Sequence, residues 1–287
     1  MAGSPTEPGE APGVPQIGAT ELVLSHFCLR YASFEERVEA AAVAGLSQIG
    51  LFHRNYAQLL ADGATPSSLR AVLNRHGVRV SELEVLRPWA EDERGRAAAA
   101  DGVRLVMEMA ETFGARYLQV IGPCPPDMDR AAEVLAGLCD RAAEVGLIVG
   151  VEFLPFTNIA DAGVALDLVL RADRPNAGIC IDSWHHFRGA DDWSLLERLP
   201  PERIAAVQLN DGPLVPEGPD YLEDCLANRR VPGEGAFDLP RLVGLLRSRG
   251  VSVPLSMEVI SNKLDALPPT VAVQRIVDGT RSLLAES

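Results

Sequence analysis

The stretch that decides the fold is residues 129–152, DRAAEVLAGLCDRAAEVGLIVGVE. Its first part, Asp129–Val145, is helix-like, and Gly146 then supplies a residue that readily ends a helix in the left-handed conformation. The apolar run Leu147–Val151 follows at once, and a carboxylate, Glu152, closes it. A helix that leads through one glycine into an apolar strand is the repeating unit of a parallel α/β fold.

The same alternation continues from residue 21 to the end of the chain. Eight strands are expected, at Leu22–Cys28, Gln48–His53, Val78–Leu86, Arg116–Ile121, Leu147–Phe153, Gly178–Asp182, Ile204–Leu209 and Val253–Ile260. Eight helices are expected to follow them, at Phe34–Ala44, Pro66–His76, Glu91–Phe113, Asp129–Val145, Asp161–Leu170, Asp192–Leu199, Asp238–Arg249 and Pro269–Leu284. Good N-caps or first-turn prolines begin several of these helices, namely Ser33, Thr65 with Pro66, Asp161 and Asp238. Glycines that can take a left-handed C-cap end several, namely Gly45, Gly77, Gly114, Gly146 and Gly250.

Length and the number of helix–strand units agree with one barrel domain. The 287 residues are enough for one (β/α)8 barrel, which needs ~250 residues. A doubly wound sheet would also alternate, but eight units and the absence of a Gly-x-Gly-x-x-Gly turn disfavour it. We therefore expect a single α/β TIM barrel over residues 20–287. Residues 1–19, rich in Pro, Gly, Ala, Ser and Thr, are expected to form a flexible N-terminal tail.

Charge and cysteine usage exclude several classes of protein. A net charge of −14 argues against nucleic acid and against anionic membranes as partners, because both need a basic surface. Five scattered cysteines without a Cys-x-x-Cys pair fit reduced thiols. The first 20 residues have no Lys or Arg and no apolar core of a signal peptide, and no apolar run is long enough to span a bilayer. The sequence predicts a cytoplasmic protein.

Four polar residues each close a strand-like run and lie about 25 to 50 residues apart: Glu152, Asp182, Gln208 and Glu258. In a parallel barrel all four converge at the C-terminal mouth, where such barrels keep their chemistry. Three carboxylates cannot crowd there without a cation to offset their repulsion. Because the set offers only oxygen, it favours one Mn²⁺ or Mg²⁺ ion, with Co²⁺ as an alternative.

Such a site predicts proton chemistry beside a carbonyl. A metal that holds neighbouring carbonyl and hydroxyl oxygens acidifies the adjacent carbon. A carboxylate at the site can then remove that proton, and another can return one. Glu152 and Glu258 come from strands on opposite sides of the ring, so one base could face each side of a bound substrate.

Five motifs carry a resemblance to a known family: Val151-Glu-Phe-Leu-Pro155, Asp182-Ser-Trp-His185, Val207-Gln-Leu-Asn-Asp211, Arg229-Arg-Val-Pro-Gly-Glu-Gly235 and Ser256-Met-Glu258. Over residues 20–285 the chain resembles the sugar isomerase/epimerase superfamily of metal-dependent barrels related to xylose isomerase. This superfamily includes ketose 3-epimerases, hydroxypyruvate isomerase, inosose dehydratase and 3-dehydroshikimate dehydratase.

The resemblance implies roles for particular residues. It implies that Glu152, Asp182, Gln208 and Glu258 bind the metal, that the two glutamates are the acid/base pair, and that the positions matching His185 and Arg229 contact substrate oxygens. Many epimerases of this type have histidine where this chain has Gln208, and some dehydratases resemble the chain there. That departure puts simple ketose epimerisation in doubt and leaves the metal site standing.

Two reactions remain open at this point. The leading hypothesis is a metal-dependent isomerase or epimerase of a sugar or other polyhydroxy ketone, working through an enediolate. The alternative is a metal-dependent dehydratase (a lyase) of an inosose or a dehydroshikimate-like hydroxyketone, in which the enediolate expels a β-hydroxyl as water. The partner is then a small molecule, with a homodimer also to be considered because barrels of this family often pair. A DNA-repair endonuclease would need a histidine-rich site and a basic surface, and the full ligand set argues against a metal-free binding barrel.

Further residues lie at or near strand ends, and for each a packing role competes with a place in the pocket: His53, Glu82, Glu84, Trp89 and Gln119. Of the adjacent His185 and His186, one at most is expected to face the site, and we favour His185. The long connection Asp211–Pro232 is expected to be a lid or binding loop on the catalytic face. A phosphorylated substrate would call for a glycine-rich site near the last two strands, for which the candidates are Gly212, Gly233 and Gly235.

Overall fold

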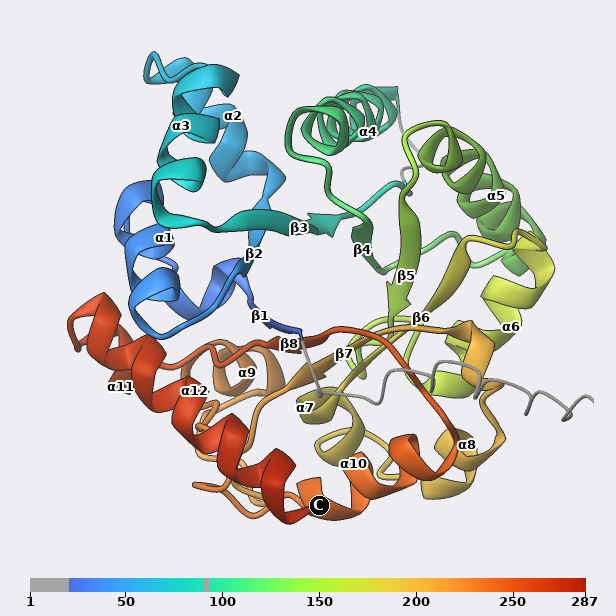
Figure 1. Cartoon of the computed structure of the whole chain (residues 1–287). Coiled ribbons are helices and arrows are strands. Elements are labelled where there is room, and N and C mark those ends of the chain that lie inside the picture. Colours follow the sequence, from blue (N-terminus) through green and yellow to red (C-terminus); the bar gives the residue numbers. More distant parts are fainter. Residues whose placement is uncertain (1–20, 90–92) are drawn as a thin grey trace, which may run out of the picture.

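A computed structural model of the chain describes residues 21–89 and 93–287. The predicted tail, residues 1–19, lies outside this range. Eight parallel strands form a closed barrel in which each strand pairs with the next and the last pairs with the first. They are β1 (Leu22–Leu24), β2 (Gln48–Phe52), β3 (Arg79–Leu86), β4 (Tyr117–Ile121), β5 (Ile148–Glu152), β6 (Ala177–Asp182), β7 (Ile204–Leu209) and β8 (Leu255–Met257). The expected TIM barrel is confirmed, and Figure 1 shows the ring of strands inside a ring of helices.

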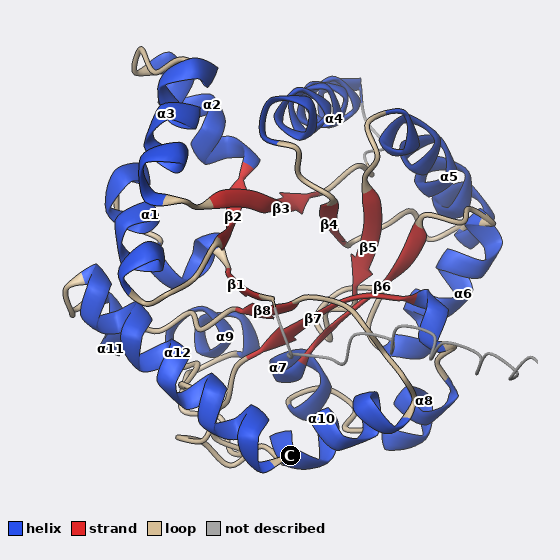
Figure 2. Ribbon diagram, in the orientation of Figure 1, coloured by secondary structure: helices blue, strands red, loops and turns tan. Residues whose placement is uncertain are grey.

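The eight expected helices are present, with ends within about two residues of the predicted ones. They are α1 (Phe34–Val43), α3 (Pro66–His76), α4 (Glu93–Phe113), α5 (Met128–Glu144), α6 (Ala162–Ala172), α8 (Trp193–Arg198), α10 (Leu239–Ser248) and α12 (Pro269–Glu286). The predicted start of the third helix, Glu91, lies outside the described residues. Figure 2 shows these helices on the outside of the barrel, so their apolar faces cover the strands.

Shorter helical segments were not predicted. They are α2 (His53–Ala61), α7 (Ser183–Phe187), α9 (Tyr221–Ala227), α11 (Asn262–Asp265) and two 3₁₀ turns, η1 (His26–Leu29) and η2 (Pro201–Arg203). Four of them, η1, α2, α7 and α11, begin within a few residues of a strand's carboxyl end, and α9 lies inside the predicted long loop. None of these segments has more than nine residues, and so short a segment gives little periodicity by which a helix can be predicted.

Helix ends follow the chemistry that the sequence predicts. Ser33 and Thr65 each form a capping box with the residue three positions later. Asp161 and Asp238 each accept hydrogen bonds from first-turn N–H groups of their helices. The five predicted C-terminal glycines all have positive φ, between 66° and 74°, a region that is costly for any residue with a Cβ.

The interior of the barrel holds polar groups near its mouth. Glu82 accepts a hydrogen bond from Ser256 Oγ at 2.7 Å, and Glu84 accepts one from Ser25 Oγ at 2.9 Å. Burial raises the pKa of Glu82 to about 7, and burial together with the neighbouring Glu82 raises the pKa of Glu84 to about 8. The Glu84 carboxylate lies over Gly50, where an added Cβ would meet Glu84 Oε1 at 1.6 Å. A glycine is therefore required there.

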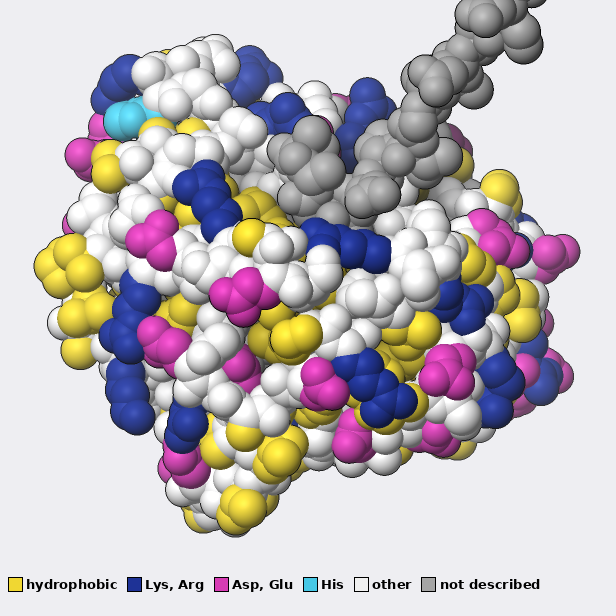
Figure 3. All heavy atoms as spheres, turned by 60° about the horizontal axis from the view of Figure 1, so that its bottom comes forward, with side chains coloured by type: hydrophobic (Ala, Val, Ile, Leu, Met, Phe, Trp, Pro, Cys, Tyr) yellow, Lys and Arg dark blue, Asp and Glu magenta, His cyan; other side chains and the backbone are white. Residues whose placement is uncertain are grey.

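The face shown in Figure 3 carries side chains of both charges, and the cysteines lie in the interior. Figure 3 shows acidic and basic side chains interspersed on this face. Exposed ion pairs of the molecule include Arg171 with Asp129 and with Asp167. All five cysteines are buried and unpaired, as the sequence predicts. Within the described residues, no helix has both the length and the apolar composition to cross a membrane.

Candidate active site

The carboxyl ends of four adjacent strands bring the predicted ligands together. Glu152 is the last residue of β5, Asp182 is the last of β6, Gln208 lies one residue from the end of β7, and Glu258 follows β8 directly. Asp182 and Gln208 are partners in the β6–β7 register. All four side chains are buried, with exposed fractions of 0 to 4%, so the cluster lies at the floor of the mouth and not on the surface.

Arg229 lies between two of these carboxylates. Its Nη1 donates hydrogen bonds to Asp182 Oδ2 at 2.8 Å and to Glu258 Oε2 at 2.9 Å, and Nε donates to the carbonyl oxygen of Cys225 at 3.2 Å. The guanidinium is itself 2% exposed. The sequence predicts that Arg229 contacts the substrate. The structure adds a second function, that of counter-ion to two buried carboxylates.

Glu152 has a different set of neighbours. Gln119 Nε2 donates to Glu152 Oε2 at 2.6 Å, and His185 Nε2 lies 3.3 Å from Glu152 Oε1. The other ring nitrogen, His185 Nδ1, lies 2.8 Å from the hydroxyl of Tyr221, whose ring stacks on the imidazole. His186 points elsewhere, with Nε2 3.6 Å from Asp191 Oδ1. Of the two adjacent histidines, His185 is therefore the one in the site.

Burial and charge act in opposite directions on the carboxylates. Burial favours a raised pKa for Asp182, but the adjacent Arg229 and His185 outweigh it and lower the pKa to about 2. For Glu258 burial prevails over Arg229, and the neighbouring Glu152 adds to it, so the pKa lies well above the usual range. Arg229 is shared by Asp182 and Glu258, and the raised pKa of Glu258 shows that this one guanidinium does not offset the crowding of three carboxyl groups. The site therefore favours an additional cation.

The side chains present fit a divalent metal ion. Ligand atoms of Glu152, Asp182 and His185 all lie within 4.8 Å of one another. One buried amide oxygen of the same site, Gln119 Oε1, has no hydrogen-bond partner among the described residues, whereas Gln208 Oε1 accepts from Gln119 Nε2 at 3.2 Å and from Cys180 Sγ at 3.4 Å. Buried polar atoms without partners indicate a site that the protein alone does not satisfy. The structure thus adds an imidazole, His185, to the oxygen ligands that the sequence predicts.

A cavity of about 500 Å³ opens above these residues. Its floor includes Gln119, Glu152, His185, Arg229 and Glu258. Aromatic and basic residues that the sequence analysis did not single out also line it, namely Phe27, Phe52, Phe156, Arg54 and Arg87. Each of them ends or follows one of the strands β1, β2, β3 and β5. That position at the carboxyl end of a strand is the one sequence signal that could have identified them.

The undecided residues now separate into two groups. His53, Trp89 and Gln119 line the cavity, and Gln119 contacts the predicted ligands directly. Glu82 and Glu84 belong instead to the buried interior of the barrel, where Ser256 and Ser25 donate to them. Cys180 is fully buried, as expected.

Asp211 organises the loop that carries Arg229. Its Oδ1 accepts hydrogen bonds from the N–H groups of Gly212 and Phe237, and its Oδ2 accepts one from Gly233. Its backbone also pairs with Arg230 in both directions. Because Asp211 occupies the amides of Gly212 and Gly233, these residues do not provide the phosphate site for which the sequence made them candidates. Gly235 packs on the same carboxylate, since an added Cβ there would lie 2.0 Å from Asp211 Oδ1.

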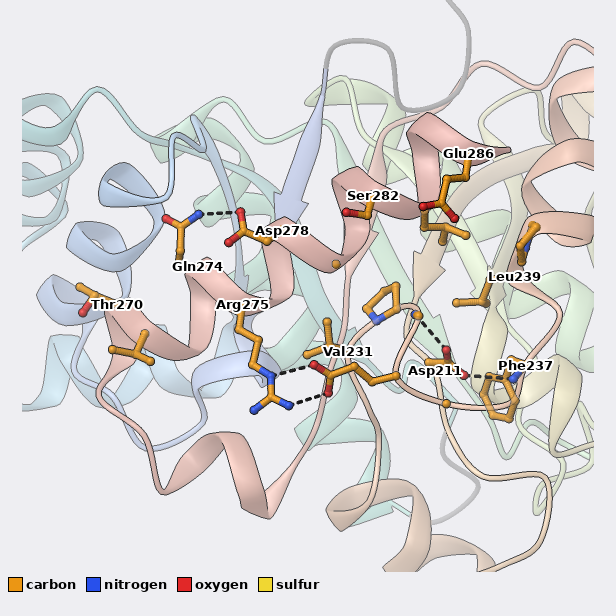
Figure 4. Close-up of a pocket in the computed structure, with 18 of the residues that line it drawn as sticks. Asp211, Val231, Phe237, Leu239, Thr270, Gln274, Arg275, Asp278, Ser282 and Glu286 are labelled. Carbon is orange, nitrogen blue, oxygen red and sulfur yellow. Dashed lines mark hydrogen bonds and ion pairs between the residues drawn. The ribbon is translucent and has the colours of Figure 1, made fainter.

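A second and larger hollow lies outside the barrel, beside this loop. It measures about 1040 Å³ and is lined by α12, the start of α10 and residues 231–237. Figure 4 shows Asp211 bound to the loop on one side of the hollow and Arg275 paired with Glu234 on another. None of the predicted ligands lines it. The smaller cavity at the barrel mouth is therefore the candidate active site.

Comparison with known proteins identifies the family. Residues 38–282 match the family described as Xylose isomerase-like TIM barrel. The chain is 30% identical over 255 residues to a 3-dehydroshikimate dehydratase of Pseudomonas aeruginosa, a match that covers 87% of this chain and 39% of the relative. This protein belongs to the xylose isomerase-like TIM-barrel family.

Other relatives have different printed activities. An inosose isomerase of Bacillus licheniformis is 26% identical over 178 residues, covering 58% of this chain and 62% of the relative. Among solved structures, the IolI protein with a bound zinc atom has a TM-score of 0.83 at 20% identity, covering 93% of this chain and 99% of that one. The likeness to the zinc-bound structure establishes the shared fold. The chain spans about two fifths of the length of the dehydratase that it matches.

Proposed function

We propose that this protein is a metal-dependent enzyme that removes a proton from the carbon beside the carbonyl of a polyhydroxy ketone. The observation that carries the proposal is the buried group of Glu152, Asp182 and His185, whose ligand atoms lie within 4.8 Å of one another. Glu258 joins this group through Arg229, which donates to both Asp182 and Glu258. Such a set has few uses other than holding a cation next to a substrate.

The chain supplies both the ion's ligands and the proton acceptors. Glu152, Asp182, Gln208 and Glu258 would hold the ion, with His185 as a further donor to it or to a substrate oxygen. When bound, the ion polarises the substrate carbonyl and so acidifies the adjacent carbon.

The proton itself is handled by the glutamates. Glu152 takes it, because Gln119 orients this carboxylate and His185 lies on its other oxygen. Glu258, which follows β8 and so lies three strands from Glu152 around the ring, returns a proton.

Two outcomes share this first step. Return of the proton to another face or carbon gives isomerisation or epimerisation, whereas loss of a β-hydroxyl gives dehydration. The dehydratase relative matches a larger share of the chain, 87%, than the inosose isomerase does, 58%. This supports dehydration of a cyclic hydroxyketone as the first candidate, with isomerisation of an inosose-like ketone as the second.

Metal analysis is the first test. We expect about one divalent ion per chain in the wild type and loss of most of it in the double variant Glu152→Gln/Glu258→Gln. A surface double variant with the same charge change, Glu39→Gln/Glu111→Gln, should bind as the wild type does. If the wild type neither contains nor takes up Mn²⁺, Mg²⁺, Co²⁺ or Zn²⁺, the proposal is wrong.

Product mass then separates the two reactions. Dehydration of 3-dehydroshikimate lowers the product mass by one water, whereas isomerisation of an inosose conserves mass. If the metal-loaded protein turns over an inosose and leaves 3-dehydroshikimate unchanged, the second candidate replaces the first.

A further inference from the structure

The imidazole of His185 lies between the active-site cavity and a tyrosine of another segment. His185 belongs to α7, directly after β6, and Tyr221 is the first residue of α9, which follows β7. The Tyr221 hydroxyl lies 2.8 Å from His185 Nδ1, and the two rings stack with 6.0 Å between their centroids and an interplanar angle of 19°. The ring of Phe156 packs against both, with centroids 6.4 Å from His185 and 5.6 Å from Tyr221. One side of the imidazole is therefore occupied by a hydroxyl group and aromatic surface.

Helix α9 is fixed to the barrel, so the position of Tyr221 is part of the fold. Asp224 of this helix is fully buried and accepts a hydrogen bond from Arg188 Nη2 at 2.6 Å. The carbonyl oxygen of Cys225 accepts one from Arg229 Nε at 3.2 Å. Arg229 is the same residue that bridges two carboxylates of the site. The helix that carries Tyr221 is thus anchored to the site itself.

The surroundings of the two ring nitrogens require the same tautomer of His185. Nε2 lies 3.3 Å from Glu152 Oε1, and an ionised carboxylate oxygen only accepts hydrogen bonds, so Nε2 is the nitrogen that carries the proton. In a neutral imidazole Nδ1 is then an acceptor that needs a donor. The Tyr221 hydroxyl is that donor, because burial raises the pKa of the phenol and keeps it protonated. Glu152 and Tyr221 therefore select one form of the ring from its two sides.

This tautomer decides whether His185 can bind the ion. A nitrogen that carries a proton has no lone pair for a metal, and Nε2 is the nitrogen beside Glu152. Histidines that bind metals generally donate their other ring N–H to a carboxylate, a carbonyl or a water. Here a hydroxyl that is itself a proton donor occupies that side of the ring. The ion is left to the four oxygen ligands that the sequence predicts.

We propose that Tyr221 is the positioning residue of His185: its hydroxyl donates to Nδ1 and so directs the Nε2–H group toward Glu152 and the substrate. His185 then donates a hydrogen bond to a substrate oxygen and is not a ligand of the ion. No proton is transferred in this contact, and the N–H group stabilises the negative charge that develops on the oxygen when the adjacent carbon loses its proton. Of these two described residues, His185 lines the cavity and Tyr221 does not, so Tyr221 acts through the imidazole. This inference rests on the proposed function and deepens it.

Nuclear magnetic resonance of protein that contains isotope-labelled histidine tests the tautomer directly. Correlations from the ring C–H groups to both ring nitrogens show which nitrogen carries a proton. The chain has five histidines, and His185 is assigned by the loss of its signals in His185→Gln. We expect a proton on Nε2 of His185 in the metal-free protein and after loading with Zn²⁺, a diamagnetic ion that readily binds imidazole. Tyr221→Phe keeps the stacked ring but removes the donor, and should show a mixture of both tautomers, while unchanged signals of the other histidines would show that the variant is folded.

Turnover provides a second measurement. For whichever of 3-dehydroshikimate and an inosose the wild type converts, Tyr221→Phe should lower kcat about three- to tenfold, the effect of one hydrogen bond, with KM changed less than about twofold. The loss falls on kcat because the donor matters most when charge develops on the substrate oxygen. Tyr56→Phe is the matched control, since the Tyr56 hydroxyl donates to Glu108 at 3.2 Å and both of these described residues lie outside the cavity lining. It should leave the His185 signals and kcat unchanged.

Other outcomes would overturn the proposal in distinguishable ways. A proton on Nδ1 alone in wild-type His185, or loss of the Nε2–H signal when Zn²⁺ binds, would make His185 a metal ligand. A Tyr221→Phe protein with the spectrum and kcat of wild type would remove the positioning role and leave the proposed function intact. If the wild type takes up no ion and converts neither ketone, the proposed function fails together with the catalytic role of His185, whereas the spectrum of the metal-free protein still reports the contact with Tyr221.

Discussion

Removal of the Arg229 guanidinium should destabilise the metal-free protein strongly. Arg229 is 2% exposed and donates to both Asp182 and Glu258 at 2.8 and 2.9 Å. Arg229→Met keeps an apolar side chain of similar length but leaves two buried carboxylates without their cation. Breaking a buried ion pair by removing one partner costs about 3–5 kcal/mol. For a barrel of this size that corresponds to a fall in Tm of roughly 6–12 °C.

A divalent ion should compensate for this loss. Because the ion and the guanidinium neutralise the same carboxylates, the variant should gain more Tm than wild type when Mn²⁺ is added after treatment with a chelator. Arg188→Met is the matched control. Arg188 is also buried and pairs with Asp224 at 2.6 Å, but Asp224 is not among the predicted ligands, so its Mn²⁺ response should equal that of wild type.

Differential scanning calorimetry, with and without Mn²⁺, checks both parts of this prediction. A cost below about 1 kcal/mol for Arg229→Met, the level of an exposed pair, would refute the assignment of Arg229 as a buried counter-ion. Equal Mn²⁺ responses in all three proteins would show that the ion and Arg229 do not share carboxylates.

Three further predictions concern the scaffold. Gly50→Ala should lower the free energy of unfolding by about 1–3 kcal/mol through overpacking, because the new Cβ would lie 1.6 Å from Glu84 Oε1. Chemical denaturation should show a smaller loss in a Glu84→Ala background, where that oxygen is absent. Asp211→Ala removes the acceptor of three N–H groups and should lower the free energy of unfolding by about 2–4 kcal/mol, with a smaller loss for Asp211→Asn. Hydrogen exchange at Gly233 and Phe237 should accelerate in the alanine variant. Unchanged exchange would refute the role of Asp211 in the loop. Burial, with Glu82 nearby, raises the pKa of Glu84 from 4.5 to about 8, so its protonated form stabilises the native state fully below pH 4.5 and that contribution is lost as the pH rises to 8. Relative to Glu84→Gln in chelator, wild type should therefore lose about 3 kcal/mol between pH 5 and pH 8, and parallel pH curves would contradict the buried, protonated state.

Local physical chemistry made most of the fold predictable. A glycine follows five of the predicted helices, as at Gly146, because the chain there takes a left-handed turn before the next strand. The apolar runs had to be central strands, since a fully buried parallel strand is apolar on both faces. The polar residues that end those runs, such as Glu152 and Asp182, could be placed at one mouth because all parallel strands end on the same side.

Short segments over the mouth were harder to predict. Helices α9 and α2 have only seven and nine residues, so periodicity does not distinguish them from loops. Tyr221 and Arg54 lie on these segments and were missed for that reason. The position of Arg230 beside Asp211 was equally hidden, because their pairing depends on how a long loop folds back.

By itself the sequence determined the eight-stranded barrel, the parallel direction of its strands and the residues that end those strands. These features could be predicted because helix caps, glycine turns and apolar runs act over a few neighbouring residues. The tertiary structure alone decided that Arg229 reaches across 47 positions to Asp182, that Gln119 and His185 flank Glu152, and that Arg54 and Arg87 line the same cavity. Those relations depend on barrel closure and on the packing of loops against one another. Their energies come from contacts between distant residues, which no local pattern in the chain encodes.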